Sequence, residues 1–251
     1  MDKKSKLSAI ILVAGYGKRI SNYTIKPKCL LKFGNYTILQ RNIKFLINLG
    51  IKKITIVVGY KSKDVIKNIK SYLSEYKDNI KIIENKKYLT HGNCYSLYLG
   101  LKNSITDVIY FDGDLVYKKS ILQNYLNHKS KNSILVGKGN ENDIECAKIF
   151  TSNNIVKRVI EKKLFKNKKY KFLGESLGIN KIEKKNIKFF IKIAKEKFKI
   201  KKNLNLNWDT FYDQFILKKF KINYFFIKSN KWIEIDTHQD YKNALKMFRF
   251  K

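Results

Sequence analysis

The chain is poor in residues that cross-link a protein or divide it into parts. Among 251 residues there is one proline, Pro27, and no proline- or serine-rich linker separates two halves. The three cysteines, Cys29, Cys94 and Cys146, are far apart and form no CxxC pair, which argues against a disulfide framework or a zinc site. We therefore expect a single domain spanning residues 1–251.

Long hydrophobic runs are also missing. No stretch approaches the roughly 20 apolar residues that span a bilayer. The N-terminus imitates a secretion signal, but its apolar run ends after a few residues at Lys18 and Arg19, and no small-x-small cleavage site follows. These features predict a soluble, cytoplasmic protein without membrane insertion.

Acidic residues and arginine are scarce beside lysine. The 54 Lys and Arg face 20 Asp and Glu, a formal net charge of +34, which by itself is typical of nucleic-acid binding. However, only Arg19, Arg41, Arg158 and Arg249 are arginines, and the lysines are spread along the whole chain. Recognition surfaces favour arginine, whose planar fork pairs bidentately with phosphate. We interpret the excess as a solvated surface that attracts small anionic substrates, and expect no specific nucleic-acid partner.

Short apolar runs alternate with amphipathic stretches in the first half. The runs predict strands buried on both faces, and apolar residues at helical spacing predict helices between them. Strands are expected at 9–13, 54–58, 80–83 and 108–111, and helices at 38–49, 65–73 and 95–101. This alternation predicts an α/β fold with a doubly wound, mostly parallel sheet.

The second half is less regular, and its later strands are expected to extend or cover the sheet. Ser152-Asn153-Asn154 predicts a hairpin turn. Asp240, three residues after Thr237, predicts a helix that begins with a capping box. Further strands are expected at 134–136, 147–150, 155–160, 224–227 and 232–235, and further helices at 184–197 and 208–220.

Two glycines and two basic residues follow the first predicted strand, in Ala14-Gly15-Tyr16-Gly17-Lys18-Arg19. Ligands of open α/β sheets bind outside the carboxyl ends of the strands, where glycines admit a phosphate and basic side chains neutralise it. The segment is neither a dinucleotide GxGxxG nor a P-loop. A plain tight turn explains it as well, but Lys26-Pro27-Lys28 favours phosphate binding because it places a rigid turn and another lysine nearby.

Acidic residues end two other predicted strands. Asp112 and Asp114 follow the strand at 108–111, and Asp236 follows the strand at 232–235. Mg²⁺ takes hard oxygen ligands, usually one or two carboxylates together with substrate phosphates. Aspartate at strand ends also serves ordinary turns, so the residues alone leave both alternatives open.

Five segments, in order, resemble one protein family. AIILVAGYGKR with KPKCLLKF resembles the GxGxR…PK signature of sugar-phosphate and amino-alcohol-phosphate nucleotidyltransferases. GNCYSLYLGL, YFDGDL, the series IECAKIF, VKRVIEKK and GESLGI, and WIEIDTHQDYKNA are similar to segments of the phosphocholine and aminoethylphosphonate cytidylyltransferases. The resemblance covers nearly the whole chain. One departure is a shorter loop between Arg19 and Lys28.

The resemblance implies a GT-A-like, Rossmann-related nucleotidyltransferase fold with an extra small β region. Residues 1–115 would form a nucleotide-binding half and residues 116–251 an acceptor-binding half. It also implies a Mg²⁺-dependent transfer of CMP from CTP to a small phosphorylated amino-alcohol or phosphonate, with release of pyrophosphate. The attacking phosphate is already anionic, so catalysis needs positioning and charge neutralisation and no general base.

The resemblance further assigns residues to roles. The catalytic residues would be Arg19, Lys28, Asp114 and Asp236, of which Asp114 and Asp236 bind the metal. The nucleotide would contact Ala14, Gly15, Tyr16, Gly17, Lys18, Gly92, Asn93 and Ser96. The acceptor would contact Lys162, Glu175, Trp208, Asp209 and Glu234. Trp208 and Tyr212 have helical spacing, so an aromatic box around an acceptor amine and a place in the core are both open.

Two other hypotheses remain from the sequence. Within the same chemistry, the acceptor is a sugar-1-phosphate or inositol phosphate. From another class, the chain is a non-catalytic nucleotide-binding regulatory module. The joint presence of Arg19, Lys28, Asp114 and Asp236 argues against the second.

Overall fold

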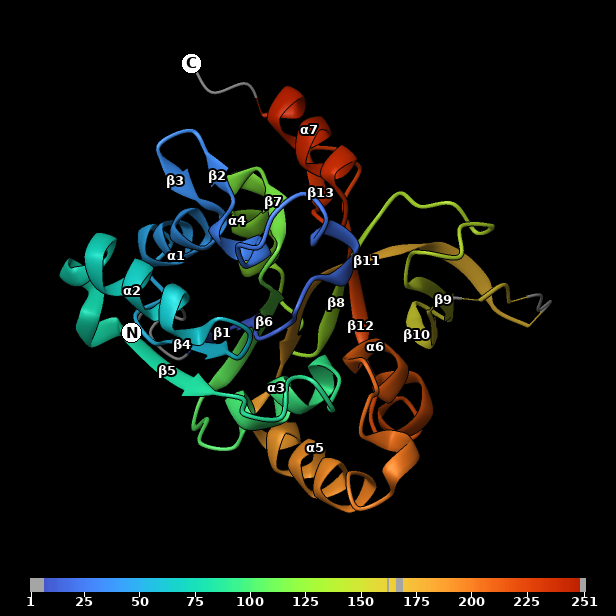
Figure 1. The fold of residues 1–251 in the computed structure, drawn as a ribbon. Coiled ribbons are helices and arrows are strands. Elements are labelled where there is room, and N and C mark those ends of the chain that lie inside the picture. Colours follow the sequence, from blue (N-terminus) through green and yellow to red (C-terminus); the bar gives the residue numbers. More distant parts are fainter. Residues whose placement is uncertain (1–6, 162, 166–168, 249–251) are drawn as a thin grey trace.

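The computed structural model describes residues 7–161, 163–165 and 169–248. Figure 1 shows helices packed on both faces of a central sheet. The elements, in order, are β1 (Leu7–Val13), β2 (Lys32–Phe33), β3 (Tyr36–Thr37), α1 (Ile38–Asn48), β4 (Ile54–Val58), α2 (Ser62–Tyr72), β5 (Ile80–Glu84), α3 (Asn93–Leu101), β6 (Asp107–Asp112), β7 (Leu115–Tyr117), α4 (Lys119–Asn127), β8 (Ser133–Gly137), β9 (Lys148–Ser152), β10 (Ile155–Ile160), β11 (Lys171–Ile182), α5 (Lys184–Lys197), α6 (Trp208–Phe211), β12 (Asn223–Phe226), β13 (Trp232–Glu234) and α7 (His238–Met247).

The first half forms the parallel part of the sheet. Strands lie in the order β5-β4-β1-β6, and β1 pairs in parallel with both β4 and β6. The chain therefore winds outward from β1 to β5 and then returns to the other side of β1 with β6. Ligands of such sheets bind at this switch point, outside the carboxyl ends of the strands. The predicted α/β, doubly wound fold is confirmed.

The apolar run of β1 is continuous because both of its faces are buried. Ala9, Ile11 and Val13 belong to one hydrophobic cluster with residues of α1, α2 and α4. Ile10 and Leu12 belong to the opposite cluster, with residues of α3, α5 and α6. Side chains alternate across a strand, so a strand between two helical layers needs apolar residues at every position.

The second half extends the sheet with mainly antiparallel strands. β11 pairs antiparallel with β6, β8 and β9, while β12 pairs in parallel with β8. The predicted hairpin turn is confirmed between β9 and β10, where Asn153 and Asn154 both have positive φ. The capping box of α7 is confirmed as well, because Thr237 and Asp240 exchange hydrogen bonds.

The predicted regular helix over residues 208–220 is wrong in part. Only α6 is α-helical, and Tyr212–Ile216 continue it as a π-helical turn. Within that turn, the Asp213 carboxylate accepts hydrogen bonds from Arg158 at 2.7 Å and from the N–H of Val159 at 2.9 Å. These long-range contacts anchor the turn to β10, and the local periodicity of the sequence does not predict them.

Within the described part of the chain, the helices are too short or too polar to cross a membrane.

Candidate active site

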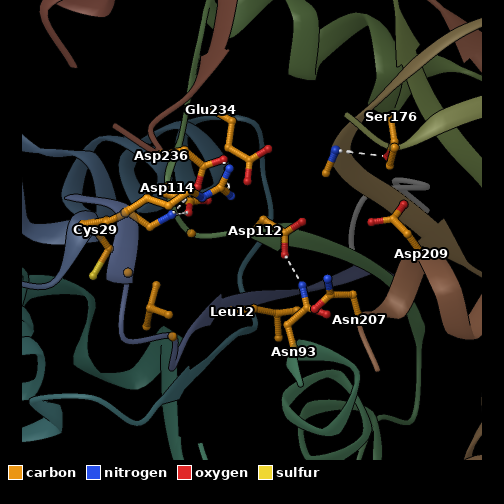
Figure 2. A pocket seen from close by; sticks show the side chains of 18 of the residues that line it. Leu12, Cys29, Asn93, Asp112, Asp114, Ser176, Asn207, Asp209, Glu234 and Asp236 are labelled. Carbon is orange, nitrogen blue, oxygen red and sulfur yellow. Dashed lines mark hydrogen bonds and ion pairs between the residues drawn. The ribbon is translucent and has the colours of Figure 1, made fainter. Parts of the chain in front are cut away.

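A cleft of about 700 Å³ opens at the switch point of the sheet. It is lined by the segment after β1, by Asp112 and Asp114 at the end of β6, and by Glu234 and Asp236 at the end of β13. Figure 2 shows these side chains pointing into the same pocket. The three strand-end aspartates and the glycine-rich loop predicted from the sequence therefore meet in one place.

A short ladder between β7 and β13 brings Asp236 to Asp114. Glu234 lies opposite Leu115 in this antiparallel pair, and the N–H of Ile235 donates to the carbonyl of Asp114 at 3.1 Å. The ladder joins segments about 120 residues apart in the sequence. The distance between the two aspartates therefore depends on this strand pairing and not on local sequence.

Lys28 and Arg19 neutralise these aspartates. The Lys28 Nζ lies 3.0 Å from Asp236 Oδ1 and forms a still closer ion pair with Asp114. The Arg19 guanidinium lies 2.8 Å from Asp236 Oδ2 and 3.0 Å from Glu145 Oε2. The shorter loop between Arg19 and Lys28 thus still lets Lys28 reach both carboxylates.

Local structure fixes the direction of Lys28. Pro27 precedes the 3-10 turn Lys28–Leu30, and Gly17 adopts a left-handed conformation with φ 68° beside the lysine stem. A Cβ on Gly17 would lie 3.1 Å from Lys28 Cγ. Burial would lower the pKa of Lys28, but the Asp114 and Asp236 carboxylates outweigh burial and raise it, so the ammonium stays charged.

Three carboxylates in this part of the cleft have the arrangement of a cation site. One oxygen each from Asp114, Glu234 and Asp236 lie within 4.8 Å of one another. Asp114 Oδ1 is buried and has no hydrogen-bond partner. The residues present therefore fit a small divalent cation with oxygen ligands, such as Mg²⁺. The sequence assigned Glu234 to the acceptor, whereas the structure groups its carboxylate with the two aspartates.

The surroundings of Glu234 change the pKa of its carboxyl group. Enclosure in the cleft and the neighbouring Asp114 and Asp236 charges raise the pKa of Glu234. Its side chain is exposed on the side of the cleft. A cation bound among the three groups would reverse that shift.

The cleft gathers a large share of the acidic residues of a very basic chain. Ten of the 20 Asp and Glu line it, and of the described Lys and Arg only Arg19 and Lys28 do. The ten are Asp112, Asp114, Asp143, Glu145, Glu161, Glu175, Asp209, Glu234, Asp236 and Asp240. The net charge of the chain is therefore opposite in sign to that of the cleft lining, which suits cationic groups.

Asp112 lies at the floor of the cleft. Its carboxylate accepts hydrogen bonds from Trp208 Nε1 at 3.1 Å and from Asn93 Nδ2 at 3.5 Å. Burial and the Asp114 charge raise the pKa of Asp112 to about 8. Gly178 approaches so closely that a Cβ there would lie 2.8 Å from Asp112 Oδ2.

The predicted nucleotide-binding residues divide into two groups. Ala14, Gly15, Gly17, Asn93 and Ser96 are among those that line the cleft. The others lie outside the described lining, namely Tyr16, Lys18 and Gly92.

Two of the three residues outside the lining, Tyr16 and Gly92, have other structural roles. The Tyr16 ring packs edge-on against Tyr60, with 4.5 Å between centroids. A Cβ on Gly92 would lie 2.2 Å from the carbonyl oxygen of Leu206, so backbone packing requires glycine there.

Sequence reasoning missed Asn85, a buried residue that donates to the Ser96 hydroxyl at 2.9 Å.

The predicted acceptor residues are also divided. Glu175, Asp209 and Glu234 line the cleft. Trp208 is fully buried in the core against Tyr110 and does not line the cleft, which favours the core alternative for its ring. Lys162 lies outside the described residues.

Sequence reasoning missed Glu161, which lies in the VKRVIEKK segment, and Asn207, which lies in a loop that carries no motif. Asn207 Nδ2 donates to one oxygen of Glu161, and the Thr210 hydroxyl donates to the other at 2.9 Å. Alternation in β10 places Glu161 at the end of the strand, but only the fold brings that end to the cleft.

Asp240 holds the backbone that carries Asp236. Its Oδ2 accepts from the N–H of Asp236 at 3.2 Å and from the N–H of Thr237 at 2.7 Å. Asp240→Ala is therefore expected to lower the free energy of unfolding by about 1 kcal/mol, as for other lost helix caps. Chemical denaturation measures it, and Gln239→Ala in the same turn is the control. Equal losses in the two variants would contradict this role.

Comparisons with known proteins agree with this geometry. The chain is 33% identical over 129 residues to the choline-phosphate cytidylyltransferase of Streptococcus pneumoniae, covering 51% of this chain and 53% of that protein. It is 32% identical over 139 residues to the CTP:phosphoglutamine cytidylyltransferase of Campylobacter jejuni, covering 53% of each. The chain thus spans about half the length of the curated relatives it matches.

The fold is shared over a greater length. The solved structure of the inositol-1-phosphate CTP transferase from T. maritima superimposes with a TM-score of 0.76 at 19% identity, covering 98% of this chain and 96% of that one. The predicted resemblance to nucleotidyltransferases near the phosphocholine and aminoethylphosphonate cytidylyltransferases is confirmed. Residues 26–248 match the family described as "Domain of unknown function (DUF6564)", and the chain belongs to that family.

Proposed function

We propose that the chain is a Mg²⁺-dependent cytidylyltransferase that transfers CMP from CTP to a small phosphorylated amino-alcohol or phosphonate and releases pyrophosphate. The names of the two relatives support CTP as donor, and they support an acceptor that carries phosphorus and nitrogen. The proposed site is the cleft, with the nucleotide against residues 14–19 and the acceptor toward Glu175 and Asp209.

The observation that carries this proposal is the pair of ion pairs that Lys28 forms with Asp114 and Asp236. Two carboxylates and a lysine meet at the carboxyl ends of β6, β13 and the segment after β1, where phosphates bind in such sheets. Beside them, Gly15 and Gly17 leave room for phosphate oxygens close to the backbone. A purely structural ion pair needs no such glycines and no adjoining cleft.

In the proposed reaction an acceptor phosphate oxygen attacks the α-phosphorus of CTP in line with the departing pyrophosphate. Lys28 neutralises charge at the α-phosphate, and Arg19 with the loop N–H groups holds the leaving β- and γ-phosphates. A magnesium ion held by Asp114 and Asp236, with Glu234 beside them, would supply positive charge at the reacting oxygens. Ser96 and Asn93 face the base, and Asn85 orients the Ser96 hydroxyl.

A pyrophosphate-release screen tests the proposal. CTP, UTP, dTTP and GTP are each combined with Mg²⁺ and with phosphocholine, phosphoethanolamine, aminoethylphosphonate, inositol 1-phosphate or a sugar-1-phosphate. We expect release with CTP and a nitrogen-containing acceptor, and loss of release when EDTA removes the metal. Release with UTP or dTTP and a sugar phosphate would replace the cytidylyl assignment. CTP binding without release from any pair would indicate a non-catalytic module.

A further inference from the structure

Asp209 is a buried carboxylate that faces the cleft without a partner for one of its oxygens. The residue is 9% exposed and lines the cleft, yet Asp209 Oδ1 accepts no hydrogen bond. Figure 2 shows the carboxylate pointing into the pocket across from Asp114 and Asp236, with Asp112 between them. A buried acceptor without a donor destabilises the fold, and a ligand donor at this position recovers that loss.

The surroundings of Asp209 are acidic. The charges of Glu161, Asp112 and Glu234 all act on it and, together with burial, raise its pKa. Within the described residues no salt bridge joins a lysine or arginine to Asp209 or Asp112. Excess negative potential at this end of the cleft favours a cationic ligand group.

The carboxylates around Asp209 are not arranged to share a single ion. Among described residues, the only set of three or more carboxylates close enough to share an ion is Asp114, Glu234 and Asp236. A second metal ion therefore fits poorly around Asp209. A polyatomic cation with several N–H donors reaches separated acceptors, because each donor points in its own direction.

Among the described residues, this end of the cleft has no cage of aromatic rings for a quaternary ammonium. Trimethylammonium groups have no N–H and are held by the faces of aromatic cages. Trp208 and Tyr212, the rings nearest to Asp209 in sequence, are 0% and 2% exposed and pack in the core. The rings that line the described cleft are Tyr88, His91 and Trp232, and no two of these are in ring contact with each other.

We infer that Asp209 receives a protonated primary amine of the acceptor, and that the cleft selects N–H-bearing cations over trimethylammonium. The inference rests on the proposed function for the position of the acceptor phosphate near Asp114 and Asp236. It places the two ends of the acceptor on opposite sides of Asp112. Asp209 is then a specificity-determining residue remote from the reacting phosphorus.

Phosphoethanolamine and phosphocholine test this selectivity because they differ only in three methyl groups. With CTP and Mg²⁺, kcat/KM is expected to be at least tenfold higher for phosphoethanolamine. Asp209→Asn is expected to reduce that preference to within about threefold, chiefly by raising KM for phosphoethanolamine. 2-Hydroxyethyl phosphate, which has a hydroxyl in place of the amine, is expected to be the poorest of the three acceptors with the unaltered protein.

Controls separate charge, folding and chemistry. Glu141→Gln removes one exposed charge outside the cleft lining and is expected to leave kcat/KM unchanged for each of the three acceptors. Thermal unfolding confirms that Asp209→Asn folds, and Asp209→Ser provides a smaller second variant. Calorimetric titration of phosphoethanolamine and phosphocholine measures the preference without turnover, so failure of the transfer reaction and failure of this inference are distinguishable. Equal or tighter binding of phosphocholine, or equal effects of Asp209→Asn on both compounds, would overturn the inference.

Discussion

Asp114→Ala is expected to lower kcat by on the order of a thousandfold or more while the protein remains folded. Asp114 is at the end of β6, and one of its oxygens contacts the Lys28 ammonium while the other is buried without a partner. Removing it takes away one of three carboxylates in the candidate cation site. Glu234 and Asp236 alone cannot close the same oxygen cage around a metal.

The fold is expected to survive this change. Lys28 keeps its ion pair with Asp236 at 3.0 Å, so no buried charge is left without a partner. The ladder between β7 and β13 uses the backbone of residue 114 and not its side chain. A decrease of several degrees in Tm with a cooperative transition is therefore expected.

Pyrophosphate release measures the loss, with Asp78→Ala as a matched control. Asp78 is an exposed aspartate outside the cleft, and its removal is expected to leave kcat unchanged. Asp114→Asn keeps the size of the side chain and tests whether its charge is needed. Turnover in Asp114→Ala within tenfold of the unaltered protein would remove Asp114 from the reaction.

Much of the fold can be predicted from the sequence because many of its strands and helices carry local signals. β4 and β10 have the predicted bounds, and α5 does as well, since strand and helix periods are set by burial on one or two faces. β11 gives a weaker signal. It contains Gly174 and Gly178 and two changes of register, so its twelve residues do not alternate regularly.

The candidate site divides in the same way. Asp112, Asp114 and Asp236 could be found because each follows an apolar strand, and Lys28 because it follows a rigid proline turn. Glu161 and Asn85 also follow strands, but many polar residues do so, and only the fold shows that these two strand ends reach the cleft. The sequence leaves the aromatic box undecided, because helical spacing places Trp208 equally well in a core or in a pocket, and the buried position of Trp208 favours the core.

The position of Lys28 has a consequence for metal binding. Its ammonium lies between the two aspartates that the cation site shares, so in the protein without nucleotide it already supplies their positive charge. A divalent cation must displace that ammonium or share the carboxylates with it. Phosphates of a bound nucleotide attract Lys28 and Arg19, which frees Asp114 and Asp236. We therefore expect metal to bind weakly alone and tightly together with CTP.

Lys28→Met separates these two effects. Turnover is expected to fall about a hundredfold or more, because a charge that stabilises the reacting phosphate is lost. Without nucleotide, however, Asp114 loses its ion pair and Asp236 keeps only the one with Arg19, so the variant unfolds at a lower temperature in EDTA. Mn²⁺ then binds at least tenfold more tightly than in the unaltered protein and restores much of the lost Tm.

Calorimetry and thermal unfolding with Mn²⁺, each with and without CTP, measure these changes. Lys26→Met is the matched control, because Lys26 is exposed in the same loop and makes no ion pair with the aspartates. Its metal affinity is expected to equal that of the unaltered protein. If Lys28 only holds the loop in place, Lys28→Met would lose metal affinity together with stability. Opposite changes in activity and metal affinity are explained only by competition between the ammonium and the metal for the same two carboxylates.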